Sequence, residues 1–260
     1  MSLARTALRL AVIEALNADP VIDGLCQGRV FDSRIGDMSA AEAVPVLVVY
    51  TEDDGGDAWS ANNGGPPFDQ KCDLLIEIAV RAGLADEPDM IGVVESDQEL
   101  EAVIDLLEHR VVEAVTVADT PATRLIADAV TRRVTGYKSM RFVSDETTAK
   151  LAIRMVHLAT ELKGHEPDLT DDEGPFSALP EPLKSVANSL PADSAGLATC
   201  RRLVESIVSN AGAPMPKPLL DGVQIIVAPK FSLDPLAALE PPDQPILSHG
   251  AFGVSARPNG

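Results

Sequence analysis

Apolar side chains recur three and four positions apart in several stretches of the chain, a spacing that predicts amphipathic helices. The first stretch, residues 3–18, ends at Asn17-Ala18-Asp19-Pro20. The second opens with the capping box Ser96-Asp97-Gln98-Glu99 and gives the clearest helical pattern. The third begins at Thr120-Pro121, with threonine as cap and proline in the first turn, and runs to Val134. A further helix is predicted over residues 194–210.

Other stretches carry the two-residue alternation or the β-branched runs that predict strands. The clearest alternation lies in residues 73–81, where Leu74, Ile76, Ile78 and Val80 share one face. The remaining predicted strands cover residues 29–31, 44–50, 137–143 and 147–162. The segments 44–50 and 73–81 are expected to form a hairpin.

Segments rich in turn-forming or polar residues separate these elements. Residues 20–28 are interpreted as a turn-rich connector, and residues 51–67, dense in Asp, Gly, Asn and Pro, as a long hairpin loop. Residues 163–182 are polar and acidic, which indicates a linker. The sequence thus predicts an α+β domain over residues 1–162, followed by a C-terminal extension or small domain over residues 183–260.

The predicted domain has a mixed or antiparallel sheet of about four to five strands, flanked by two or three helices. The extension is rich in proline and contains one short apolar run, Val223–Val227, that predicts a strand. No apolar run approaches the length of a membrane span, so no membrane association is expected.

Composition narrows the possible functions. The 260 residues are 45% hydrophobic, enough for a core, but only 3% aromatic, so single-stranded nucleic acid would find few stacking rings. The net charge of −19 opposes binding to phosphate backbones, and no specific nucleic-acid binding is expected.

Motifs for catalysis or cofactor binding are not apparent. The sequence has no phosphate-binding glycine loop, no metalloprotease motif and no nucleophile elbow, and its four histidines are scattered. Its acidic stretches at residues 52–57 and 168–173 are interpreted as solvated loops, and a calcium loop that starts at Asp168 fails the required spacing, with Glu173 sixth and Leu179 twelfth. We therefore expect no catalytic residue, no cofactor and no metal, and we expect the cysteines to be small buried hydrophobic residues. They are Cys26, Cys72 and Cys200.

Candidate interface residues come from charge and exposure. Basic side chains gather in one stretch of this acidic chain, where they could orient docking against an acidic neighbour or simply form a solvated face. They are Arg124, Arg132, Arg133, Lys138 and Arg141. Trp59, in the polar stretch 51–67, is the other candidate.

The order of these segments resembles the tail-terminator (tail-completion) family of tailed bacteriophages. The resemblance rests on the opening helix, Gly28-Arg29-Val30-Phe31-Asp32, the strand Val44–Tyr50, the alternating strand 74–80, the helix 97–116, and Met140–Val143 with Leu151–Met155. It covers about residues 3–162. Many members end near the last strand, whereas this chain continues for about 100 residues and has an additional helix in the middle.

The resemblance implies a structural virion protein, not an enzyme. Members form a ring, usually of six copies, that caps the tail tube, stops its polymerisation and joins it to the head connector. The implied partners are further copies of the chain, the tail tube protein, connector or neck proteins, and the sheath protein of a contractile tail. DNA would pass through the channel, and the protein would be assembled in the host cytoplasm into the virion. Alternatives are another neck or head–tail adaptor protein, an unrecognised hydrolase or nucleotide-binding enzyme, and a chaperone or regulatory module.

Overall fold

The computed structural model describes residues 3–33, 45–58, 60, 62, 64, 68–81, 97–144, 151–163 and 174–211. The chain divides into two compact units, residues 1–211 and 212–260, and all described residues belong to the first. The predicted strand at Val223–Val227 and the interface candidate Trp59 lie outside the described residues.

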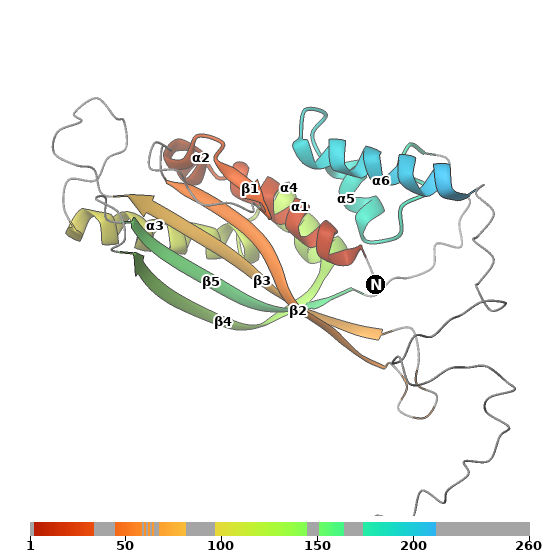
Figure 1. Ribbon diagram of the computed structural model, residues 1–260, viewed down its shortest axis with the longest axis horizontal. Coiled ribbons are helices and arrows are strands. Elements are labelled where there is room, and N and C mark those ends of the chain that lie inside the picture. Colours follow the sequence, from red (N-terminus) through yellow and green to blue (C-terminus); the bar gives the residue numbers. More distant parts are fainter. Residues whose placement is uncertain are drawn as a thin grey trace, which may run out of the picture. The chain divides into compact units, whose positions relative to one another are not determined.

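A five-stranded mixed sheet forms the centre of the first unit (Figure 1). The strand order is β1-β2-β3-β5-β4; β1 runs parallel to β2, and the other neighbours are antiparallel. The strands are β1 (Val30–Asp32), β2 (Val46–Ala58), β3 (Phe68–Arg81), β4 (Thr131–Ser144) and β5 (Leu151–Leu162). The expected α+β class is therefore confirmed.

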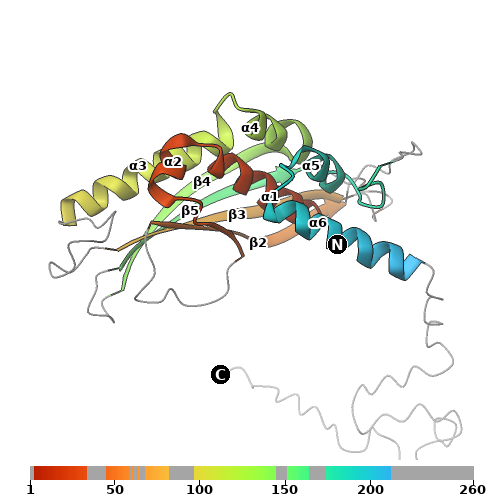
Figure 2. The same ribbon diagram turned by 90° about the horizontal axis from the view of Figure 1, so that it is seen from above.

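The helices lie on one face of this sheet (Figures 1 and 2). The core contains Leu74, Ile76, Ile78 and Val80, the face that the alternation predicted, together with Val156 and Leu158 of β5. Apolar spacing explains the first helix, because its buried positions recur along one side. The helices are α1 (Ala4–Asn17), α2 (Pro20–Cys26), α3 (Asp97–Thr116), α4 (Pro121–Leu125), the π-helix η1 (Ile126–Val130), α5 (Leu183–Ser189) and α6 (Ala195–Ala211).

Residues 20–28, predicted as a connector, contain α2 instead. The Asp19 side chain accepts hydrogen bonds from the backbone N–H groups of Val21 (2.9 Å) and Ile22 (3.0 Å), and Pro20 occupies the first turn. These are strong helix-starting signals. The connector prediction was wrong because Asp19 and Pro20 both end α1 and start α2, and only the first of these roles was assigned to them.

The prediction of a loop over residues 51–67 was wrong for its first half. Strand β2 continues to Ala58 and pairs with β3 as far as Phe68, with an irregularity between Glu52 and Gly55. The hairpin itself is confirmed. Its ladder of backbone hydrogen bonds overrides the low strand propensity of an Asp- and Gly-rich stretch.

The predicted third helix is shorter than expected. The Thr120 side chain caps α4 as predicted, accepting from the N–H of Thr123 at 3.1 Å. After η1 the chain enters β4 directly at Thr131, six residues before the predicted start of the strand at Tyr137. The Thr131 hydroxyl donates to the carbonyl of Ile126 (3.0 Å), which closes the π-helix at the strand entry.

Residues beyond β5 add to the same unit. Phe176, Leu179, Leu183 and Val186 are buried in the main core, and α5 contacts α1 and η1. The compact unit thus extends to Ala211, past the linker expected at residues 163–182. Within the described residues no helix is both long and apolar enough to cross a membrane.

Candidate functional site

The three cysteines and His157 are buried or paired within the fold. Cys26, Cys72 and Cys200 are free and buried, as predicted, and burial raises the pKa of the Cys26 and Cys72 thiols to about 11. His157 lies 2.8 Å from Asp73. Among the residues that the structure describes, no group of three or more His, Cys, Asp or Glu side chains is placed to hold a metal ion.

The basic interface candidates divide into two places. Arg124 lies on α4 and pairs with Asp119. Arg132, Arg133, Lys138 and Arg141 all lie on β4. The structure therefore brings together those four on one strand and leaves Arg124 apart.

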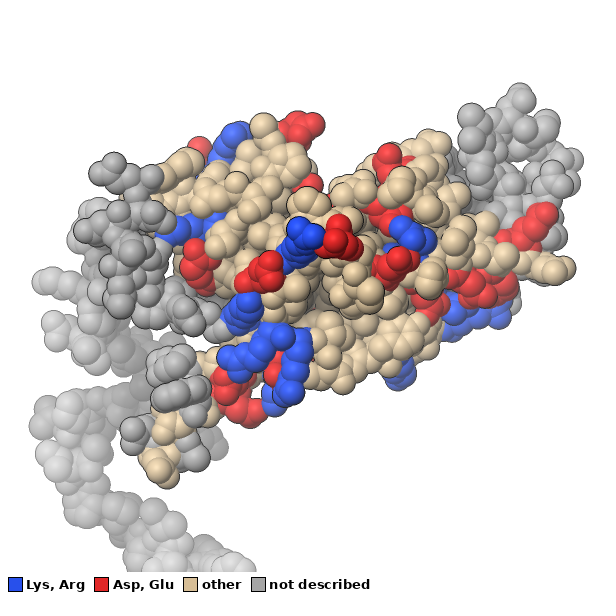
Figure 3. All heavy atoms as spheres, turned by 180° about the vertical axis from the view of Figure 1, so that it is seen from behind, with Lys and Arg blue, Asp and Glu red and all other residues tan. Residues whose placement is uncertain are grey.

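Most of the basic side chains on β4 are paired within the molecule. The Arg133 guanidinium binds both carboxylate oxygens of Glu161 at 2.8 Å, Arg132 lies 3.2 Å from Asp69, and Arg141 pairs with Glu101. The Arg133 guanidinium holds the pKa of the Glu161 carboxyl below its usual value, and burial opposes this with a smaller effect. Figure 3 shows lysine and arginine atoms beside acidic ones on the face seen from behind. The predicted basic patch is thus largely neutralised internally.

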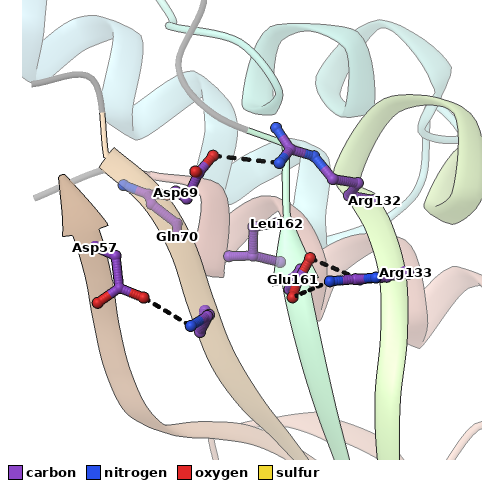
Figure 4. A pocket seen from close by; sticks show the side chains of 8 residues that line it. Asp57, Asp69, Gln70, Arg132, Arg133, Glu161 and Leu162 are labelled. Atoms are coloured by element: carbon purple, nitrogen blue, oxygen red, sulfur yellow. Dashed lines mark hydrogen bonds and ion pairs between the residues drawn. The ribbon is translucent and has the colours of Figure 1, made fainter. Parts of the chain in front are cut away.

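A shallow hollow marks the end of the sheet where these pairs meet (Figure 4). Arg132 and Arg133 reach Asp69 and Glu161 there, while Lys71 and Asp57 join β3 to β2 at 2.7 Å. At the hairpin end of the sheet these pairs link β3 to β2, β4 to β5, and β4 to β3 across β5. Each of these charged side chains is therefore paired within the molecule. The full lining is Asp57, Asp69, Gln70, Lys71, Arg132, Arg133, Glu161 and Leu162.

We expect Arg133→Ala to change the unfolding midpoint by less than about 4 °C, because exposed ion pairs contribute little and are screened by salt. The Arg133 side chain is 67% exposed. Thermal unfolding followed by circular dichroism at low and at 0.5 M salt measures the effect, with Arg124→Ala as a matched exposed control. A larger loss that persists at high salt would contradict this assignment.

A second cluster ties α3 to the sheet. Arg154, on the helix-covered face of β5, donates to Glu108 (2.8 Å), Asp105 (3.1 Å) and Glu101 (3.3 Å). The Tyr137 hydroxyl of β4 donates to the other oxygen of Glu108. Both oxygens of Glu108 are thereby engaged in holding α3 against β4 and β5.

Sequence reasoning missed this cluster, although signals for it exist. Glu101, Asp105 and Glu108 follow the i, i+4, i+7 spacing of one helix face. Arg154 alternates in phase with Val156 and other core residues, so a charge stands on an apolar strand face. A hollow of ≈ 420 Å³ adjoins the cluster, lined by Asp105, Glu108, His109, Val112, Tyr137 and Arg154.

The second face of the sheet carries no described helix. Tyr50, Glu77 and Met155 come from the adjacent strands β2, β3 and β5, and the Tyr50 hydroxyl lies 3.6 Å from the Met155 sulfur. Burial raises the pKa of the Glu77 carboxyl, and burial followed by the charge of Glu77 raises the pKa of Tyr50 to about 12. Glu77 therefore lies between the Tyr50 and Met155 side chains on a face that also carries the Asp73–His157 pair, and its carboxylate is partly desolvated.

Glu77→Gln is expected to stabilise the protein slightly at pH 7. Because the folded-state pKa of Glu77 lies above its unfolded value, the native carboxylate is unfavourable above the unfolded pKa of about 4.3. The advantage of glutamine should therefore shrink as pH falls through the raised folded-state pKa of Glu77 and be absent below about 4. Urea unfolding at pH 7 and pH 3.5 measures it, and a destabilised variant at pH 7 would contradict the expectation.

The two edges of the sheet differ. β1 has three residues and covers only Leu47–Val49 of β2. β4 has 14 residues and pairs on one side only, with β5, among the described strands. Three of its side chains are exposed apolar groups: Val134 (39%), Tyr137 (55%) and Phe142 (47%).

Comparison with models of known protein families finds no match to this chain, and comparison with curated proteins finds no similar sequence.

Proposed function

We propose that this protein is a structural subunit of a ring that caps the tail tube of a tailed bacteriophage, stops its polymerisation and joins it to the head connector. The observation that carries the proposal is the order and pairing of the elements. A helix, a short strand at Val30–Asp32, a hairpin, a helix and a closing strand pair follow one another. This is the order of segments on which the resemblance to the tail-terminator family rests.

The unequal edges of the sheet support a ring. A head-to-tail ring requires two different patches on each subunit, because each copy contacts one neighbour with one patch and the other neighbour with another. β1 and β4 form edges that differ in length and in exposed apolar area. A two-fold dimer would use one patch twice and would leave the other edge unexplained.

Charge suits a channel that DNA traverses. With 21 basic and 40 acidic side chains, a ring of these chains would repel phosphate, so DNA would pass without adhering. The proposed role requires neither turnover nor a bound cofactor. Its partners would be further copies of the chain, the tube protein, neck or connector proteins and, in a contractile tail, the sheath protein.

The test combines light scattering of the purified full chain with negative-stain images and a tube-capping assay. We expect a ring near six copies with a central hole, and tail tubes of fixed length when the protein is added during tube assembly. A monomer that leaves tube length unchanged would refute the proposal.

A neck or head–tail adaptor role is the second candidate. It is favoured by α5 and α6, which extend the compact unit beyond β5, where many terminators end. An adaptor would bind the connector and leave tube length unchanged, so the same assay, extended to connector binding, separates the two roles.

A further inference from the structure

Part of strand β4 is suited to accept another strand. Between Gly136 and Ser144 it pairs with β5 in continuous register, whereas its irregularities fall between Thr131 and Gly136. Bulges disturb pairing along an edge, so the regular stretch 136–144 is the part that can extend the sheet. No described strand pairs with its outer side.

Side chains on this stretch differ between the two faces of the sheet. Phe142, 47% exposed, and Met140 alternate with Arg141 and Ser139, so the face without described helices carries two apolar side chains next to Lys138. An exposed edge of this length with large apolar side chains is prone to pair with another chain. A partner strand should therefore be apolar on the side of Phe142.

The chain contains a segment of that character outside the described residues. In Val223-Gln224-Ile225-Ile226-Val227, a strand would place Val223, Ile225 and Val227 on one face, and Gln224 and Ile226 on the other. β-branched residues favour pleated pairing. No Lys or Arg lies between Lys217 and Lys230, so the segment would not repel Lys138 and Arg141 of β4.

We propose that residues 223–227 of a second copy add to residues 136–144 of β4 as a further strand. This inference rests on the proposed ring and specifies how its neighbours join. Each subunit would donate one segment and accept another, which is the head-to-tail arrangement that closes a ring.

The position of α6 favours a second copy over the same chain. α6 contacts α5, and α5 contacts α1, which lies against β1 and β2. Both views place α6 on the β2 side of the sheet, whereas β4 forms the opposite edge (Figures 1 and 2). Within the described unit the last helix therefore lies away from the β4 edge, which favours pairing of that edge with a second copy.

The connection has enough length. Residues 212–222 separate α6 from the proposed strand, and an extended chain spans at most about 3.3–3.6 Å per residue, or roughly 40 Å here. That is sufficient to cross a subunit boundary.

Disulfide trapping between two full-length variants tests the inference. Phe142→Cys and Ile225→Cys, purified separately with tags of different mass, are mixed under a mild oxidant. We expect a covalent dimer that contains one chain of each kind, formed at least tenfold more than with Val117→Cys in place of Phe142→Cys. The native cysteines are all buried, so they should add little background crosslinking. Val117, at the end of α3, is 75% exposed and serves as the accessible control position.

A single chain that carries both cysteines separates the remaining outcomes. Trapping within one chain, seen as a faster-migrating monomer without mixed dimers, would overturn the second-copy assignment. Trapping no greater than with Val117→Cys would overturn the pairing altogether. Rings that form equally well with Ile225→Pro would also overturn it but would leave the proposed function standing. Mixed dimers without tubes of fixed length would support the strand pairing and overturn the proposed function.

Discussion

Arg154→Ala is expected to lower the free energy of unfolding by about 2–4 kcal/mol, because it leaves acidic side chains of α3 without their shared cation. Arg154 is 16% exposed and Glu108 is 12% exposed at the side chain, so water cannot fully replace the guanidinium. Asp105 and Glu101 lose the same partner. Urea unfolding at pH 7, monitored by far-ultraviolet circular dichroism, measures the loss.

Two variants show whether the stabilisation by Arg154 comes from the geometry of its guanidinium or from its charge alone. Arg154→Lys retains the charge but cannot bind several carboxylates with one planar group, so an intermediate loss is expected. Arg141→Ala removes a cation from Glu101 at a position 54% exposed and should cost much less. If Arg154→Ala costs no more than Arg141→Ala, apolar packing alone holds α3 to the sheet.

Asp19→Ala is expected to cost about 2–3 kcal/mol, because one carboxylate performs two tasks. It caps α2 through the N–H groups of Val21 and Ile22, and it pairs with Arg110 of α3. Burial acts to raise the pKa of the Asp19 carboxyl, but the bonds to Arg110, Ile22 and Val21 outweigh it, so the pKa lies below its usual value.

The pH dependence of Asp19 has a defined sign. Because its pKa is depressed in the folded state, its charge stabilises the protein above the unfolded pKa of about 3.9 and ceases to do so as pH falls through the folded value. Asp19→Asn keeps a capping oxygen but loses the charge. Its deficit relative to the native chain should therefore be constant from pH 6 to 8 and diminish below pH 4; a deficit independent of pH would refute the role of the ion pair.

Local pattern predicted the parts of the fold whose residues carry a clear period. The alternation of Leu74, Ile76, Ile78 and Val80 fixed both the strand and its buried face. Short or tertiary-dependent elements were missed. α2 has seven residues, too few for periodicity to register, and the distal half of β2 is a strand only because β3 lies beside it.

The candidate site shows the same limit. The sequence located the basic residues of β4, since they are close together along the chain. It could not show that Arg133 pairs with Glu161 or Arg132 with Asp69, because those partners are 28 and 63 positions away along the chain. Long-range pairing decides whether a charged stretch is free to bind, and only the folded sheet reveals it.

The direct passage from η1 into β4 has a mechanical consequence. Val130 ends the helix and Thr131 begins the strand, so no loop lies between them that could yield under load. The backbone N–H of Lys163, just after β5, donates to the Val130 carbonyl at 2.8 Å, and η1 contacts α1. A force along β4 would therefore be transmitted directly to the helical layer. A subunit joined to its neighbour through this strand would pass movement to its helices with little internal deformation.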